Sequence, residues 1–286
     1  MKKTAMMVAM SLVTIFTSAL AGQEEFVPVY NAVTGQEESF RKETNSLGVQ
    51  ANVEVSFMSA CVIRGQVIND QPVAQPFLNI SKNGVSLNVW GNYNLTDRIT
   101  KQFDFNEIDL TLQYLLPIKV VEISFGIVEY TYPNKTFMDI KTPEGTETCE
   151  TTMKETREVF TQIKYPNSFV VPSLAVNYDF DEANGLYVLA GLSKDVELIN
   201  KLILTPSVST GCGNAKFNEY YFYNKKSAFN NGSADVVLKY NINDNWYTSA
   251  RLSYTWLWDD GIRDSAKQIY FDDNLLYGGV TVGYAF

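Results

Sequence analysis

Residues 73–94 read VAQPFLNISKNGVSLNVWGNYN, and this stretch decides the fold. Asn83-Gly84 separates two runs in which apolar and polar residues alternate, which is the strongest short signal for a β-hairpin. A two-residue turn fixes the register, and one face of the hairpin is then apolar while the other is rich in amides. The predicted cross-strand pairs are Lys82 with Val85, Ile80 with Leu87, Leu78 with Val89, Asn79 with Asn88 and Gln75 with Asn92.

The same alternation of period two recurs along the chain, as a strand between lipid and water requires. About twelve such segments predict an all-β fold, a transmembrane antiparallel β-barrel, because bacterial barrels use an even number of strands of roughly 9–11 residues. The predicted strands are residues 49–57, 73–81, 85–94, 107–115, 120–130, 159–164, 169–180, 186–194, 202–210, 234–242, 246–257 and 274–286.

The lengths of the connections agree with a barrel, which has short turns on the periplasmic side and longer loops outside. With both termini in the periplasm, the longer connections all fall outside, and only the short connection 181–185 departs from this rule. The long connections are residues 64–72, 95–105, 131–157, 211–233 and 258–273, and the short inner ones are 82–84, 116–119, 165–167 and 242–245.

The amino-terminal residues predict export to the bacterial outer membrane. Lys2 and Lys3 precede a short apolar run, and Ala19-Leu20-Ala21 supplies a cleavage pattern, so residues 1–21 are expected to be a cleaved signal peptide. The alternative is an uncleaved anchor, but the run is shorter than the roughly 20 residues that cross a bilayer. Residues 22–48 are expected to form a polar periplasmic lead-in or a plug inside the lumen, and residues 49–286 the barrel.

Composition excludes several function classes. The net charge of −9 argues against a nucleic-acid partner, which requires a basic surface. The chain contains no histidine, which outer-membrane phospholipases, proteases and acyltransferases use as base or acid, and no local pattern replaces it. We therefore expect no enzyme, no cofactor and no metal site.

Charged residues of both signs fall on the predicted inner faces. Acidic residues lie on the fourth and fifth strands and basic residues on the tenth and eleventh, nearly opposite in a closed ring, which predicts a field across the lumen. The alternative is that these charges pair with one another, or with Asp235, and fill the lumen. The residues are Glu107, Asp109 and Glu122 on one side and Lys239 and Arg251 on the other.

Two aromatic residues, Phe77 and Trp90, are predicted to be neighbours on the inner face of the first hairpin. A sugar or a nucleobase could stack on them. The alternative is that they fill the interior.

Cysteines offer one candidate disulfide. Cys149 and Cys212 both fall in connections predicted to be extracellular, where a bond between them would join two loops in an oxidising environment. Cys61 could compete as a partner, and unpaired thiols remain the alternative.

The chain ends in a strand with outward Val280, Val282, Tyr284 and Phe286. This pattern resembles the carboxy-terminal assembly signal of outer-membrane barrels, which implies that the barrel-assembly machinery is a partner. The alternative is an ordinary last strand.

The segment Ser59-Ala60-Cys61-Val62-Ile63-Arg64-Gly65 is similar to the first strand of a family of conserved hypothetical bacterial outer-membrane proteins, in which the motif is Ser-Asp-Tyr-x-x-Arg-Gly. Ala60 and Cys61 stand where the motif has Asp and Tyr. Thr131-Tyr132-Pro133 also looks like that family. The resemblance implies location and fold, and it singles out Arg64 at the outer rim of the lumen.

Two functions follow from these observations. The first is a narrow channel for small hydrophilic solutes, because twelve strands enclose a lumen that can hold water. The second is a closed structural or adhesive barrel whose extracellular loops bind a partner or lipopolysaccharide. Outer-membrane lipid is a neighbour in either case.

Overall fold

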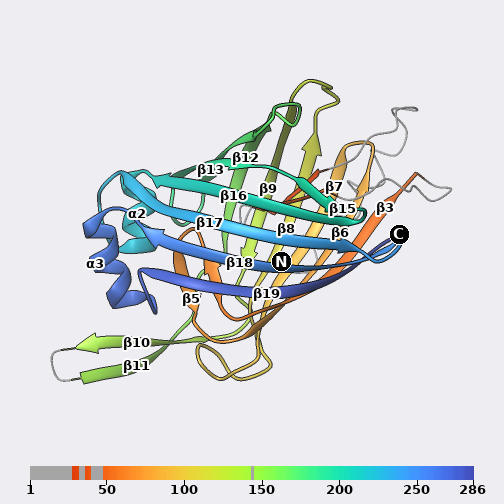
Figure 1. The fold of residues 1–286 in the computed structure, drawn as a ribbon. Coiled ribbons are helices and arrows are strands. Elements are labelled where there is room, and N and C mark those ends of the chain that lie inside the picture. The colour runs from red at the N-terminus through yellow and green to blue at the C-terminus, as the bar shows by residue number, and fades with distance from the viewer. Residues whose placement is uncertain (1–27, 32–35, 40–47, 143–144) are drawn as a thin grey trace, which may run out of the picture.

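The computed structural model describes residues 28–31, 36–39, 48–142 and 145–286. Its main feature is one closed antiparallel barrel (Figure 1). β14 and β15 both pair with β16 and act as one interrupted strand, so the ring has the twelve strands that the sequence predicts. In ring order the strands are β3 (Gln50–Met58), β6 (Val73–Lys82), β7 (Val85–Asn94), β8 (Phe105–Leu115), β9 (Glu122–Thr131), β12 (Thr156–Lys164), β13 (Val171–Asp179), β14 (Leu186–Ser193) with β15 (Val196–Ile199), β16 (Leu202–Gly213), β17 (Ala228–Asn241), β18 (Trp246–Leu257) and β19 (Asn274–Ala285).

Three small two-stranded sheets accompany the barrel in the described part of the chain. β1 (Pro28–Asn31) pairs with β2 (Gln36–Ser39), so the predicted lead-in contains a hairpin that its sequence did not indicate. The predicted signal peptide lies outside the described residues and stays a prediction. The other two sheets are β4 (Cys61–Ile63) with β5 (Gln66–Asn69), and β10 (Thr136–Thr142) with β11 (Gly145–Thr151).

The register of the first hairpin is confirmed. β6 and β7 turn at Asn83-Gly84, both of which have positive φ angles, as a tight primed turn requires. The amide of Gln75 donates to the Asn92 side chain at 3.0 Å, which agrees with the expected neighbourhood of these two residues. The observed pairs include Lys82 with Val85, Ile80 with Leu87, Leu78 with Val89 and Asn79 with Asn88.

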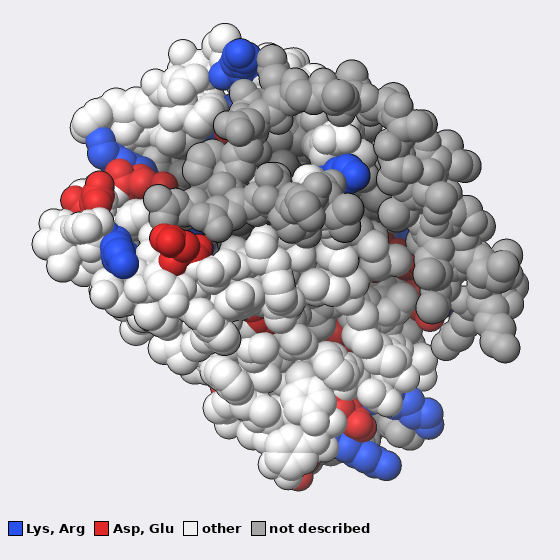
Figure 2. Space-filling model, turned by 90° about the vertical axis from the view of Figure 1, so that its right-hand side faces the viewer, with Lys and Arg blue, Asp and Glu red and all other residues white. Residues whose placement is uncertain are grey.

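The barrel wall has an apolar outer face and a largely polar inner face. Outward positions such as Leu110, Val236 and Leu238 are exposed, whereas the inward neighbours Asp109 and Thr111 are buried. Seen from the right of Figure 1, Lys and Arg side chains lie in small separate groups, and a few Asp or Glu atoms show among the other residues between them (Figure 2). An apolar outer face of this kind is typical of a barrel that spans an outer membrane.

Aromatic side chains gather near both ends of β18 and β19. Trp246 and Tyr284 meet edge to face with ring centroids 4.9 Å apart, and Tyr284 contacts Phe286 at 4.7 Å. Trp256 and Trp258 form a second group, with centroids 5.2 Å apart. Aromatic girdles at two levels are expected where a barrel meets the two membrane interfaces. The assembly role of Tyr284 and Phe286 remains a prediction.

The long connections lie at one end of the barrel, on the left in Figure 1, and two of them contain helices. α2 (Ala215–Phe222) is capped by Asn214, and α3 (Asp260–Ile269) is capped by Asp259. A hydrogen bond from Lys226 lowers the pKa of the Asp259 carboxyl, so this cap stays charged to lower pH. Within the described residues, neither helix is long and apolar enough to cross a membrane.

Several strands are longer than the sequence predicts. β12 begins at Thr156 and not at Val159. β16 continues to Gly213 and β17 begins at Ala228, so the loop predicted at residues 211–233 is much shorter in the structure. As a consequence, Cys212 lies half-buried in β16 and not in a loop. Cys149 lies in β11, and its side chain is outside the described residues, so the disulfide stays a prediction.

Candidate functional site

The connection between β3 and β6 does not project outward as the sequence predicts. It forms the hairpin of β4 and β5, whose residues Cys61, Val67 and Asn69 are buried. Arg64 and Gly65 at its tip both have positive φ angles, of 51° and 82°, which make the turn tight. We call residues 61–69 the inward hairpin.

The tip of the inward hairpin reaches the lumen wall formed by β17 and β18. A Cβ atom added to Gly65 would lie 2.5 Å from the Cβ of Asn231 on β17 and 2.8 Å from Cδ2 of Leu257 on β18. This close approach explains the glycine, since any side chain would collide with the wall. On its other side the tip meets β12 and β14 through Arg64, so the inward hairpin crosses the lumen.

Arg64 holds the tip of the inward hairpin in place through a bidentate ion pair. Its two terminal nitrogens donate to the two carboxylate oxygens of Glu158 on β12, at 2.7 and 2.6 Å. The exposed fractions of the two side chains are only 8% and 1%. Tyr130 on β9 donates its hydroxyl to the same carboxylate at 2.9 Å. Such a bidentate pair is among the strongest polar contacts in proteins, provided both charges stay paired.

Aromatic rings complete the surroundings of Arg64. Its guanidinium carbon lies 4.8 Å from the ring centroid of Tyr187 on β14 and 5.8 Å from that of Phe217 on α2. Burial acts to lower the pKa of Arg64, but the neighbouring Glu158 outweighs it and the pKa lies above its ordinary value. Arg64 is therefore a buried cation, and its partners Glu158, Tyr187 and Phe217 lie at the end of the barrel that carries the long loops.

The rest of the inward hairpin is fixed to the barrel and to the long loops. Cys61 packs in a buried cluster with Phe77 and Trp90. The Asn69 amide donates to Asn94 at 2.8 Å, and the Tyr270 hydroxyl donates to Gln66 at 2.5 Å. These contacts join both strands of the hairpin to the barrel and to the loop that contains α3.

One half of the lumen wall is filled with large polar side chains. The inward residues of β3, β6, β7, β8, β9 and β12 are mostly amides, hydroxyls and carboxylates, and most of them are buried. They bond to one another along the wall, as in the contact of Asn92 Nδ2 with Asn106 at 2.6 Å. Phe77 and Trp90 are cross-strand partners in this half and lie within the buried cluster, which favours the filling role.

The other half of the wall includes several small inward side chains beside the larger Lys239, Tyr247 and Arg251. Ser207, Ser209, Ser249 and Thr281 face inward on β16, β18 and β19 and are only half-buried.

Three of the charged residues predicted to set up a field across the lumen, Arg251, Lys239 and Glu122, have local contacts. Arg251 donates to Asp235 on the neighbouring strand at 3.0 Å, as the alternative interpretation expected. Lys239 lies over the Tyr247 ring at 4.2 Å. Glu122 meets Lys164 on the neighbouring strand at 3.9 Å. Arg251 and Glu122 are thus each paired with an opposite charge on a neighbouring strand.

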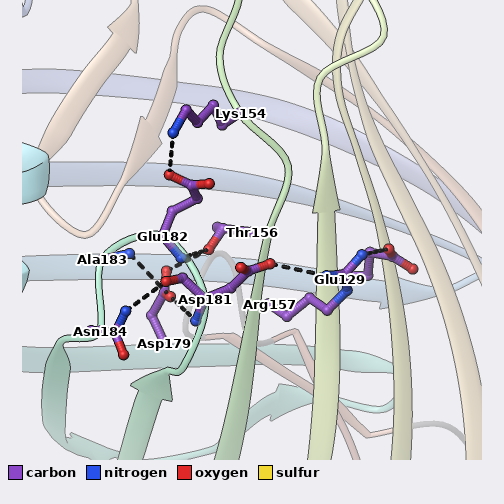
Figure 3. Close-up of polar contacts among 9 residues, drawn as sticks. All are labelled: Glu129, Lys154, Thr156, Arg157, Asp179, Asp181, Glu182, Ala183 and Asn184. Carbon is purple, nitrogen blue, oxygen red and sulfur yellow. Dashed lines mark hydrogen bonds and ion pairs between the residues drawn. The ribbon is translucent and has the colours of Figure 1, made fainter.

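A second ion-pair group lies at the end of the barrel that carries the long loops, on β9, β12 and β13 (Figure 3). Arg157 contacts Glu129 and Asp181, each at 2.9 Å, and its side chain is 42% exposed. Beside it, Asp179 accepts hydrogen bonds from Thr156 and from two backbone amides of the connection 181–185, which keeps this connection short. Arg157 and Glu158 are adjacent in sequence but point to opposite faces of β12.

The sequence did not identify Glu158 as a functional residue. The sequence predicts that this strand begins at Val159, the residue after Glu158, because Thr156-Arg157-Glu158 reads as the end of a polar loop. The alternation of the strand could have identified it, because every second residue of a strand lies on the same face. Glu158, Phe160 and Gln162 share the inward face of β12.

Comparisons with known proteins give one family match. Residues 154–286, from just before β12 to the carboxy terminus, match the model of the family described as MltA-interacting protein MipA. No curated protein matches the chain.

Solved structures similar to this chain include small porins. The KdgM porin in complex with disordered oligogalacturonate is 10% identical, with a TM-score of 0.48, over 83% of this chain and 99% of the porin. The NanC porin is 11% identical, with a TM-score of 0.43, over 82% and 98%. The translocator domain of the autotransporter NalP from Neisseria meningitidis is 12% identical, with a TM-score of 0.40, over 85% and 90%.

Proposed function

We propose that this chain is an outer-membrane barrel that binds a partner protein as a scaffold, and that its lumen is closed at rest. One observation carries the proposal: the inward hairpin crosses the lumen and is fastened to the far wall by the buried pair of Arg64 and Glu158. A diffusion channel requires a continuous water-filled path, and a buried hairpin held by paired charges opposes one. The absence of histidine agrees with a role that is not enzymatic.

We propose MltA as the partner, on the strength of the family match. The match covers β12 to β19 together with α2 and α3, and so includes one half of the barrel wall and the residues that receive the tip of the inward hairpin. A rigid barrel that holds its loops in fixed positions presents a preorganised surface, which lowers the entropic cost of binding.

The scaffold proposal predicts a direct complex. Purified full-length barrel, refolded in detergent, is expected to bind purified MltA in a saturable manner, measured by biolayer interferometry and by co-elution in size-exclusion chromatography. Heat-unfolded barrel at the same concentration serves as the control and is expected not to bind. Failure of the folded barrel to bind MltA in both measurements would contradict the proposed partner.

A second candidate function, a narrow channel for small hydrophilic solutes, is favoured by the wall of small, half-buried residues on β16, β18 and β19. The two candidates differ in conductance. With the lumen closed, the purified protein in planar bilayers is expected to show no conductance steps, and replacing Lys239 and Arg251 together by neutral residues should not create any. Discrete steps in the wild type, with a shift toward cation selectivity in the double variant, would favour the channel.

A further inference from the structure

Large apolar side chains are exposed on three turns at the end of the barrel opposite α2 and α3 (Figure 1). These turns connect β8 to β9, β12 to β13, and β15 to β16. The exposed fractions are 62% for Val120, 84% for Phe169 and 64% for Ile199. We call this set of residues the turn patch, and its members are Ile118, Val120, Tyr165, Phe169, Leu198 and Ile199.

The three turns are neighbours on the rim of the barrel. Glu122 at the start of β9 is the direct cross-strand partner of Lys164 at the end of β12, which places the first two turns side by side. Lys194, in the connection between β14 and β15, lies 2.9 Å from the ring centroid of Phe169 and so joins the second turn to the segment that leads into the third. The turn patch therefore occupies one stretch of the rim.

The turn patch lies on one side of the rim only. The tips of the other two turns at this end are polar, with Asn83-Gly84 between β6 and β7 and Asn243-Asp244-Asn245 between β17 and β18. A membrane interface surrounds a barrel on all sides. Contact with lipid therefore does not explain why the apolar turns are consecutive, whereas a partner that docks on one side of the rim does.

Charged residues of both signs border the turn patch. Lys119, Lys194 and Lys201 lie in or next to the three turns, as do Asp195 and Glu197. Since neither sign dominates, the exposed apolar side chains are the feature by which this surface differs from the rest of the rim.

We propose that the turn patch is the surface through which this barrel binds MltA, by contact with an apolar surface on that partner. This inference rests on the scaffold function proposed above. Two of the three turns lie within residues 154–286, which match the family described as MltA-interacting protein MipA. Large apolar and aromatic side chains serve as anchors in protein interfaces, and short turns hold them in fixed positions.

Binding of purified MltA to the full-length barrel in lipid nanodiscs, measured by biolayer interferometry, tests the assignment. The triple variant with Ile118→Ser, Phe169→Ser and Ile199→Ser removes one apolar side chain from each turn. Its Kd is expected to be at least about tenfold higher than that of the wild type. Binding by the wild type is expected to persist at high salt, because salt screens charges and not apolar contacts.

The double variant with Phe103→Ser and Tyr223→Ser is the matched control. Both side chains are exposed, at 57% and 74%, and lie in connections at the opposite end of the barrel. Its Kd is expected to stay within about twofold of the wild type, because side chains outside an interface contribute little to binding. Heat-modifiable mobility in gels shows whether each variant is folded. If the triple variant is not folded, Phe169→Ser alone takes its place and is expected to raise the Kd at least about threefold.

The possible failures are distinguishable. No binding by the folded wild type would overturn the scaffold function and this inference together. Binding that the triple variant retains in full would overturn this inference alone, and so would loss of binding in the Phe103 and Tyr223 variant. If the triple variant binds MltA normally but unfolds at a lower temperature in nanodiscs, these side chains contact lipid and not the partner.

Discussion

Arg64→Ala is expected to lower the free energy of unfolding by about 3–5 kcal/mol, the largest effect of any single substitution proposed for this chain. The substitution leaves Glu158 buried in the lumen without its cation, and the side chain of Glu158 is only 1% exposed. Arg64→Lys is expected to recover only part of the loss, because an ammonium group cannot reproduce the two parallel hydrogen bonds. Urea titration of the barrel in lipid vesicles, followed by tryptophan fluorescence, measures the change.

Arg157→Ala provides the matched control, since Arg157 precedes Glu158 and bonds to Glu129 and Asp181 on the outer face of the same strand (Figure 3). Its side chain is 42% exposed, so solvent screens both pairs, and the expected loss is at most about 1 kcal/mol. Equal losses for Arg64→Ala and Arg157→Ala would show that the inward hairpin is not held by a desolvated ion pair.

Leu110→Arg is expected to cost about 2–4 kcal/mol if the residue lies near the middle of the bilayer, because the guanidinium would face hydrocarbon. Leu110 is an exposed outward residue of β8, paired with Val89 and Glu129 on the neighbouring strands. The same substitution at Leu238, which is outward on β17, is expected to act in the same direction. The difference should be measured by reversible urea unfolding in vesicles.

Ser207→Arg is the control for the outward substitutions. Ser207 faces the lumen on β16, is half-buried and lies across from Asp235, so a new guanidinium there has room and a carboxylate nearby. We expect a change within about 1 kcal/mol. A cost at Ser207 as large as that at Leu110 would contradict the assignment of inner and outer faces.

The closed barrel and its register could be predicted from the sequence because both rest on local patterns. Alternation of period two sets the faces of each strand, and Asn83-Gly84 fixes the pairing of β6 with β7 to the residue. Strand ends were less predictable. The polar Thr156-Arg157-Glu158 reads as a loop, yet it continues β12 because its backbone pairs with β9 in the closed ring.

The sequence by itself therefore determined the class of protein: a twelve-stranded antiparallel barrel with an apolar outer face and polar inner residues, Asp109 among them. Only the tertiary structure decided that residues 61–69 turn into the lumen, that Arg64 meets Glu158, and that Arg251 pairs with Asp235. The physical reason is the range of the interactions. Facing and register depend on neighbours along one or two strands. The position of the hairpin tip depends on Glu158 and Asn231, which are 94 or more residues away and become neighbours only when the ring closes.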